Sequence, residues 1–392
     1  MLDPRVASLV KGLFGEHYKK MNASDIAPKA VEKREFGFGD FEKKIAFRHV
    51  AFKSAEELKR YLVENGPPFV NASAAEYERP DGRPMEAKGW IGSELIFDLD
   101  ATDLKLPCQQ VHGRQWVCDI CLSSIKKETV RLIEDFLIPD FGFSASDIEI
   151  NFSGNRGYHV HVMNDDIFRL ASSARRQISE YITGSGIDPE KLFWLLPVEK
   201  EGRKSFEVLH GPTPSDGGWG GRLAKGLVGA LGTGIGTLEE MGIEREWAGK
   251  LFRNRTAVML GISSGNWDMI KIPKKEEFWK RVVRNMAIKQ SDSIDRNVTN
   301  DTQHMLRLPN SLHGDTGLSG KRLGSVSELD RFDPMEDAVA FRNGTLEVMV
   351  QKAQKFTMLG TEFGPYDNRK EELPLSVALY LLLKRVAVLP NQ

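Results

Sequence analysis

The sequence lacks the features of a membrane protein and of a secreted, disulfide-bonded protein. None of its apolar runs reaches the ~20 residues that a transmembrane helix needs, and its first residues lack the basic-then-apolar pattern of a signal peptide. It contains only three cysteines among 392 residues, and an odd number without a secretory context argues against disulfides. We therefore expect the protein to be cytoplasmic.

An excess of charge of either sign is also missing. The formal net charge is −1, from 54 basic and 55 acidic residues, which excludes a polycationic protein that coats nucleic acid. Any contact with nucleic acid must come from a local basic patch or from a partner subunit. The length allows one large domain or two modest ones.

Two enzyme signatures are absent as well. No histidine is followed two residues later by glutamate, the spacing that zinc deaminases require. The glycine-rich segments 232–236 and 314–321 lack a lysine and a hydroxyl residue at the spacing of a P-loop. We interpret both segments as turns.

The segment Glu94–Asp100 carries two acids on an apolar strand. Side chains alternate along a strand, so Asp98 and Asp100 share one face with Ile96, while the leucines and Phe97 face the other way. Neighbouring carboxylates repel one another, and desolvation increases the repulsion. A divalent metal ion is the natural counter-charge, although two acids on a strand are also typical of a solvated edge.

Residues 148–162 predict a β-hairpin. Both flanks alternate with period two, and the connection Ser153–Gly157 contains two glycines, which supply the positive φ that a tight turn needs. Arg156 lies in the turn, and His159 follows on the same face as His161. Small residues with backbone N–H groups, an arginine and a histidine are suited to binding phosphate.

A third element lies far along the chain. Asp295 stands next to an apolar residue, and the segment 306–314 contains Arg307 and, six positions on, His313. Together the three elements hold three carboxylates for two metal ions, and serine, arginine and histidine side chains for a triphosphate. These are the groups that nucleotidyl transfer needs.

These segments resemble the catalytic small subunit of the archaeal-eukaryotic DNA primase family. Its hallmarks are a strand-borne D-x-D, an S-G-x-R-G-x-H turn, a distant third aspartate and an L-[RK]-x-P-x-S-x-H-x-x-T-G stretch. In this sequence they correspond to 97–100, 153–159, Asp295 and 306–317. The segments 34–38 and 76–80 fit as well, so the similarity spans most of the chain.

The resemblance implies a nucleotidyltransferase that synthesises short primers on a single-stranded DNA template and releases pyrophosphate. It implies nucleoside triphosphates as substrates, two catalytic Mg²⁺ or Mn²⁺ ions, and a primase large subunit as partner. Asp315 stands where the family often has a basic residue, and we leave it out of the expected site because an acid cannot help to hold phosphate. The implied catalytic residues and metal ligands are Asp98, Asp100 and Asp295, and the implied nucleotide-binding residues are Ser153, Arg156, His159, Arg307 and His313.

The cysteines give a separate signal. All three fall in one short segment with a histidine, in the pattern Cys-x3-His-x5-Cys-x2-Cys. Four thiolate and imidazole ligands close the tetrahedral sphere of zinc, which marks a structural rather than a catalytic site. We expect a structural Zn²⁺ held by Cys108, His112, Cys118 and Cys121, and related primases carry a zinc motif just after the D-x-D.

Three other functions fit parts of the pattern. A primase-polymerase or repair polymerase would extend existing primers with the same groups, and only synthesis without a primer separates it from a primase. A two-metal nuclease would use the three acids, but it would not need a triphosphate site. A zinc-containing module that only binds nucleic acid would leave the acids without a purpose.

The order of elements favours an α+β fold. We expect an amphipathic helix over 1–20, a helix that Ser54 begins and Gly66 ends, another around 125–137, and an apolar core helix within 375–389. The expected architecture is a mixed-sheet, primase-type catalytic core of residues 1–165 and 290–392, with the zinc knuckle at 108–121. A mainly helical subdomain with glycine-rich loops at 217–221 and 232–236 is expected as an insertion at 166–289.

Overall fold

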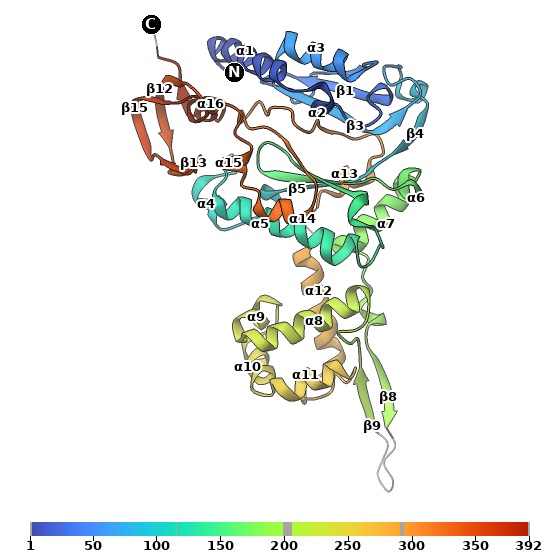
Figure 1. Ribbon diagram of the computed structural model, residues 1–392. Coiled ribbons are helices and arrows are strands. Elements are labelled where there is room, and N and C mark those ends of the chain that lie inside the picture. The colour runs from blue at the N-terminus through green and yellow to red at the C-terminus, as the bar shows by residue number, and fades with distance from the viewer. Residues whose placement is uncertain (1, 115, 199–205, 291–293, 391–392) are drawn as a thin grey trace. The chain divides into compact units, whose positions relative to one another are not determined.

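A computed structural model describes residues 2–114, 116–198, 206–290 and 294–390. The chain divides into two compact units (Figure 1). The first unit comprises Met1–Glu134, Phe143–Arg176 and Ile294–Gln392, and the second comprises Asp135–Gly142 and Gln177–Ser293. None of the helices in the described ranges is long and apolar enough to cross a membrane.

The first sheet of unit one has five strands in the order β10-β3-β1-β2, with β4 also paired to β3. The helices α1 and α3 cover one face of this sheet (Figure 1). On that face the ring of Phe38 lies 4.5 Å from Tyr61 of α3, and Phe36 lies 5.1 Å from Phe52. The bounds are Pro4–Lys20 (α1), Ala55–Asn65 (α3), Arg34–Gly39 (β1), Phe47–Val50 (β2), Phe69–Tyr77 (β3), Trp90–Ser93 (β4) and Met305–Arg307 (β10).

Both helices that cover this sheet were expected from the sequence and are confirmed. Asp3 caps α1 by accepting a hydrogen bond from the Arg5 N–H (2.8 Å), and Val6, Val10, Phe14 and Tyr18 form the buried stripe at four-residue spacing. Ser54 caps α3 by accepting from the Glu57 N–H (3.3 Å), and Gly66 ends the helix with φ +48°.

The second sheet has four strands in the order β11-β6-β7-β5. The expected hairpin is confirmed, because β6 (Ile148–Phe152) and β7 (Gly157–Val162) pair in antiparallel register. Leu95, Phe97 and Leu99 of β5 (Leu95–Asp100) are buried. They share their face of the strand, and α5 (Asp119–Arg131) packs against β5 and β7. The last strand, β11, spans Lys321–Leu323.

The expectation of a mixed sheet was wrong. Every strand pairing in the described part of the chain is antiparallel. The connection from β5 to β6 contains helices and returns the chain in the same direction, as a crossover does. However, β7 lies between β5 and β6 and pairs with both, so the two parallel strands never touch.

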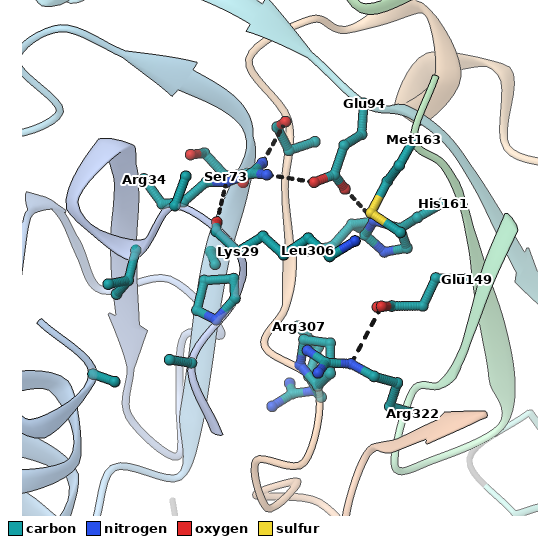
Figure 2. A pocket seen from close by; sticks show the side chains of 18 of the residues that line it. Lys29, Arg34, Ser73, Glu94, Glu149, His161, Met163, Leu306, Arg307 and Arg322 are labelled. Carbon is teal, nitrogen blue, oxygen red and sulfur yellow. Dashed lines mark hydrogen bonds and ion pairs between the residues drawn. The ribbon is translucent and has the colours of Figure 1, made fainter. Parts of the chain in front are cut away.

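The chain passes from the first sheet to the second at Glu94, between β4 and β5. The Glu94 side chain is buried, and its carboxylate accepts hydrogen bonds from Arg34 of the first sheet (2.5 Å) and from His161 Nδ1 of the second (2.7 Å; Figure 2). Arg34 also donates to the carbonyl oxygens of Ser73 and Ala74. This buried ion pair therefore joins the two sheets.

The C-terminal part of unit one is a smaller three-stranded sheet with a buried helix. The expected core helix is confirmed as α16 (Leu375–Leu383), in which every residue from Ser376 to Leu383 is buried. The strands are β12 (Thr345–Ala353), β15 (Tyr366–Pro374) and β16 (Ala387–Val388), and a separate hairpin is formed by β13 (Phe356–Met358) and β14 (Thr361–Phe363).

The second unit contains α8 to α12 and the hairpin of β8 and β9. Its core includes Leu223, Leu227, Trp267 and Trp279. The expected loop at 217–221 was wrong, because α8 begins at Gly218. Apolar burial of the residues that follow outweighs the low helix propensity of glycine there. The bounds are Gly218–Thr233 (α8), Ile235–Glu240 (α9), Arg245–Arg253 (α10), Arg255–Ser263 (α11), Lys275–Gln290 (α12), Trp194–Val198 (β8) and Phe206–His210 (β9).

Short helices connect these elements. Among them, α5 continues into a π-helical turn at Leu132–Leu137, so the helix expected around 125–137 is confirmed. The α-helices are Ala23–Ile26 (α2), Cys108–His112 (α4), Asp165–Phe168 (α6), Ser172–Thr183 (α7), Arg296–Asn300 (α13), Val326–Arg331 (α14) and Pro334–Asp337 (α15), and the 3-10 turns are Val31–Lys33, Met85–Lys88, Ala101–Leu104, Ala145–Asp147 and Pro189–Lys191.

We expect Glu94→Gln to destabilise the fold by about 3–5 kcal/mol, because it leaves the buried Arg34 without its counter-charge. Urea unfolding at pH 7 measures this loss. Glu16→Gln is the matched control, since Glu16 is 65% exposed in a 3.7 Å surface ion pair, and it should change stability by less than about 0.5 kcal/mol.

The pH dependence separates the charge of Glu94 from its packing. Burial opposes ionisation, but the charge of Arg34 and the hydrogen bond from His161 outweigh it and lower the pKa of Glu94 to about 2. The stabilisation is therefore complete above the ordinary carboxyl pKa of ~4.3 and is lost as the pH falls towards 2. The difference between wild type and Glu94→Gln should shrink over this interval; a constant difference would contradict the assignment.

Candidate active site

Two of the expected acids lie side by side on β5. Asp98 pairs in register with His159 of β7, and Asp100 pairs with Gly157. Both carboxylates are 30% exposed, whereas the apolar side chains between them are buried. The alternation of the strand thus presents both acids on the same open face.

The third acid reaches β5 through a backbone hydrogen bond. The Asp295 N–H donates to the carbonyl oxygen of Asp98 (3.0 Å). Asp295 is also the N-cap of α13, where its Oδ1 accepts from the Asn297 N–H (2.8 Å). A residue far along the chain is therefore held next to the free edge of the second sheet.

The three acids interact electrostatically. Partial burial and the negative charges of Asp100 and Asp295 raise the pKa of Asp98 to about 7. One cation partly balances them, because Arg156 Nε donates to Asp100 Oδ2 (2.8 Å), while Asp100 Oδ1 accepts from Thr102. In the described residues the three acids do not converge as a ready-made group of metal ligands, and Asp100 and Asp295 are engaged in local hydrogen bonds.

The turn between β6 and β7 is built on Ser153 and Gly154. Gly154 adopts φ +81°, and a Cβ there would lie 3.0 Å from the His313 Cβ. Ser153 Oγ accepts from the N–H groups of Asn155 (3.4 Å) and Gly157 (3.2 Å). The turn therefore uses the Ser153 hydroxyl to fix its own shape and directs Arg156 towards Asp100.

His159 lies on the same face of the sheet as the acids. Its Nε2 is 3.7 Å from Asp98 Oδ1, and its buried Nδ1 has no hydrogen-bond partner among the described residues. Burial, reinforced by nearby positive groups, holds the pKa of His159 well below its usual range. The ring is therefore neutral at pH 7.

The segment after β10 supplies the remaining two expected residues. Arg307 is buried with its guanidinium 5.2 Å from the centre of the Phe69 ring, and His313 meets the same ring edge-on at 5.4 Å. His313 Nδ1 accepts from the Asp315 N–H (3.0 Å). In the neutral ring the hydrogen then sits on Nε2, which can donate to a ligand.

The turn at 153–157 and the segment 308–317 after β10, which we call the two basic turns, are hydrogen-bonded to each other. Thr316 Oγ1 donates to the Gly154 carbonyl oxygen (2.6 Å). Burial first, then the charges of four surrounding cations, holds the pKa of His313 well below its usual range. These cations are Arg307, Lys44, Lys384 and Arg156.

Several residues of this region were missed in the sequence. Glu94 stands four positions before Asp98 on the same strand face, so the alternation of the strand could have revealed it. Lys44 and Lys384 carried no motif signal, because only the fold brings them to the first basic turn, where Lys384 Nζ donates to Asn155 Oδ1 (3.1 Å). Asp315 was left out of the expected site, yet its side chain lines a pocket with Arg156.

A second pocket of about 370 Å³ lies on the far side of Glu94. Figure 2 shows Arg34, Glu94 and His161 in its wall, together with the ion pair of Arg322 and Glu149 (3.3 Å). Between Glu94 and Asp98, the side chain of Ile96 packs with Ala74, Val298 and Leu306. This apolar cluster separates the pocket from the acids along the strand.

The cysteine segment folds into a compact group. Cys108 and His112 lie one helical turn apart on α4, Cys118 caps α5, and Cys121 lies in its first turn. Cys121 Sγ is 3.5 Å from Cys108 Sγ and from His112 Nε2, and 3.8 Å from Cys118 Sγ. All four ligand atoms lie within 4.8 Å of one another, as a metal site requires.

Three acids beside two linked basic turns are the groups used by the class of enzymes that act on nucleotide phosphates with divalent metals. Comparison with known sequences agrees with this class. Residues 97–324 match the family described as DNA primase small subunit. The DNA primase small subunits of Methanothrix thermoacetophila and Methanococcoides burtonii are 33% and 32% identical, each over 98% of this chain and 99% of the relative. That of Thermoplasma acidophilum is 31% identical over 96% of this chain and 99% of its own length.

The chain belongs to the DNA primase small subunit family. Members of this family are DNA-directed nucleotidyltransferases that synthesise primers, so the activity expected from the sequence is confirmed. Membership also implies catalysis that depends on metal ions, and the Cys/His group could hold a further metal ion.

We expect Asp98→Asn to stabilise the folded protein at pH 8. Because the pKa of Asp98 is raised to about 7, folding favours its protonated form, and stability is lost as the pH rises from the unfolded value of ~3.9 through 7. Removing the charge should gain about 1–2 kcal/mol in chelator-treated protein, after allowance for partial exposure.

Urea unfolding at two pH values checks this expectation. At pH 8 the variant should be the more stable protein, and at about pH 4, near the unfolded pKa, the two should differ little. Equal or lower stability of the variant at pH 8 would show that the three carboxylates do not repel one another.

Proposed function

We propose that this chain synthesises short primers on single-stranded DNA with Asp98, Asp100 and Asp295 as its catalytic carboxylates. The main support is the cluster of acids itself, because burial and the negative charges of Asp100 and Asp295 raise the pKa of Asp98, and Arg156 balances these charges only in part. The proposed nucleotide-binding residues are Ser153, Arg156, His159, Arg307 and His313, which occupy the two linked turns beside these acids.

The donor set fits Mg²⁺ or Mn²⁺. Hard divalent cations take carboxylate oxygens, and the three acids would hold two such ions once their oxygens leave the Thr102, Arg156 and Asn297 hydrogen bonds. Bound there, the ions would activate the attacking 3′-hydroxyl and neutralise charge on the α-phosphate and the leaving pyrophosphate.

The protein's own groups bind and orient the triphosphate. Arg156, which donates to Asp100 here, would have its guanidinium available to phosphate oxygens if that acid held a metal ion. Arg307 keeps a fixed positive charge, since burial lowers its pKa only to about 10. His313 donates from Nε2 as a neutral group. These donors are in place before charge develops on the pyrophosphate, which favours its departure.

The linked turns distinguish this proposal from hydrolysis of a diester. A nuclease needs the acids but has no use for a second basic turn tied to the first. Extension of existing primers uses the same groups as primer initiation, so a primase-polymerase remains the alternative that only an assay separates.

The proposal also includes a structural zinc ion, an inserted subdomain and a partner subunit. The Cys/His group would hold a structural Zn²⁺, since four soft and borderline ligands with no open position suit that ion. Residues 166–289 would form an inserted, mainly helical subdomain. A primase large subunit would be the partner, because the near-zero net charge leaves this chain little general attraction for DNA.

We expect Asp98→Ala to abolish synthesis on an unprimed single-stranded DNA template with labelled nucleotides and Mg²⁺ or Mn²⁺. The variant loses a carboxylate that the proposed metal site requires, so activity should fall at least ~1,000-fold. Glu149→Gln, on β6 of the same sheet, is the control and should remain active.

The products of this assay distinguish a primase from a primer-extending polymerase and from a nuclease. Short products from wild type alone support a primase that acts through this site. Extension of an added primer without initiation by the isolated chain, restored by the large subunit, supports the heterodimer. Degradation of the template would favour the nuclease, and more than a few per cent of activity in Asp98→Ala would contradict the assignment.

We expect Cys118→Ser to lose zinc and to lower the Tm by about 5 °C or more, because a structural zinc site contributes directly to folding energy. Metal analysis of the purified protein and thermal unfolding measure the two effects. Ser123→Ala, on the exposed side of α5, should keep both. A wild type that is already free of zinc and as stable as the variant would refute the site.

A further inference from the structure

The pocket of about 370 Å³ beside Glu94, which we call the Glu94 pocket, has no part in the proposed chemistry. One of its walls belongs to the second sheet, where Glu149 of β6 stands directly opposite His161 of β7 and Arg322 follows on β11. The three catalytic carboxylates are not among its lining residues. The pocket is therefore a separate site on the same unit.

The rest of the lining is largely apolar. It comes from residues 72–74 of β3, from Leu306 of β10, from Met163 after β7 and from the loop 27–32. A volume of about 370 Å³ falls in the range of ~300–1,000 Å³ that is typical of sites for small organic ligands. A lone inorganic anion would leave most of this space and the whole apolar part unused.

The acids in the sheet walls are already paired with cations. Glu94 accepts hydrogen bonds from Arg34 and His161, and Glu149 forms an ion pair with Nε of Arg322 (3.3 Å). This pairing occupies one side of the Arg322 guanidinium, which is still 34% exposed. Its terminal nitrogens can therefore donate to a further anion.

The remaining lining charges leave an excess of cations. They belong to Lys29, Arg307 and Glu32, so the whole pocket is lined by four cations and three acids. The Lys29 side chain is exposed and extends into the pocket (Figure 2). The charge of the pocket therefore favours an anionic ligand.

His161 offers a ring nitrogen to such a ligand. Its Nδ1 is hydrogen-bonded to Glu94 (2.7 Å), whereas Nε2 is buried and has no hydrogen-bond partner among the described residues. The residue is only 9% exposed, and an unsatisfied polar atom at such a position costs free energy. A polar group of a ligand at Nε2 would remove this cost.

We propose that the Glu94 pocket binds a mononucleotide. Its phosphate would be bound by Lys29 and Arg322, and its base would lie against Met163 and Leu306. A nucleobase suits this environment, because its face is apolar while its edge carries the polar groups that His161 Nε2 needs. A free nucleoside monophosphate and the terminal nucleotide of a strand present the same groups.

The test measures binding of each ribonucleoside 5′-monophosphate, and of a short 5′-phosphorylated oligonucleotide, by calorimetry in EDTA. Without divalent metal the catalytic carboxylates repel a phosphate, so the measurement favours the Glu94 pocket. Lys29→Ala and Arg322→Ala should each weaken binding about 10-fold or more, because each removes a charge-assisted hydrogen bond. Lys29→Arg should recover most of the affinity. Lys33→Ala is the matched control, since Lys33 is 47% exposed and does not line the pocket.

Lys29 and Arg322 belong to distant segments of the chain, so a loss of affinity in both variants places the ligand in the pocket that they share. Competition between a monophosphate and the phosphorylated oligonucleotide, but not its unphosphorylated form, would identify the end of a strand as the ligand; binding of monophosphates alone would identify the free nucleotide. The proposal is overturned if wild type binds neither probe, or if Lys29→Ala binds as tightly as wild type. Loss of binding in Arg156→Ala alone would also overturn it, because the nucleotide would then lie at the catalytic site.

Discussion

The buried carboxylate of Glu94 connects the parts that form the active site. It is bound by Arg34 from the first sheet and by His161 from the second, and Arg175 donates to its carbonyl oxygen (2.7 Å). Asp98 follows four residues later on the strand that leaves this junction. This ion pair therefore anchors the start of the strand that presents the acids.

Charge is distributed unevenly around the site. At β5, burial and the negative charges of Asp100 and Asp295 raise the pKa of Asp98. The pocket beside the first turn has more cations than acids. The uncompensated charge of the acid cluster and that of the basic pocket each cost free energy. A nucleotide with its metal ions would balance both charges. The arrangement thus favours the complex over either component.

Local patterns in the sequence predicted the local structure well. The alternation of 148–162 identified the hairpin and its turn, and the caps at Ser54 and Gly66 identified α3, because these features depend on neighbours in the chain. The helix that begins at Gly218 could not be predicted from propensity, since burial of its apolar side overrides the preference of glycine. The antiparallel sheets depend on β7 inserting between β5 and β6, which no local pattern specifies. Lys384 reaches Asn155 only through the packing of α16.

The attachment of Asp295 to Asp98 has a consequence for the synthesis of this protein. The first two acids leave the ribosome early, but the third follows the whole second unit in the sequence. A nascent chain can therefore fold most of its second sheet while it still lacks a complete set of acids. Premature termination between residues 162 and 295 would leave a fragment that has Asp98, Asp100 and the first basic turn but lacks both the third acid and the segment that carries Arg307 and His313.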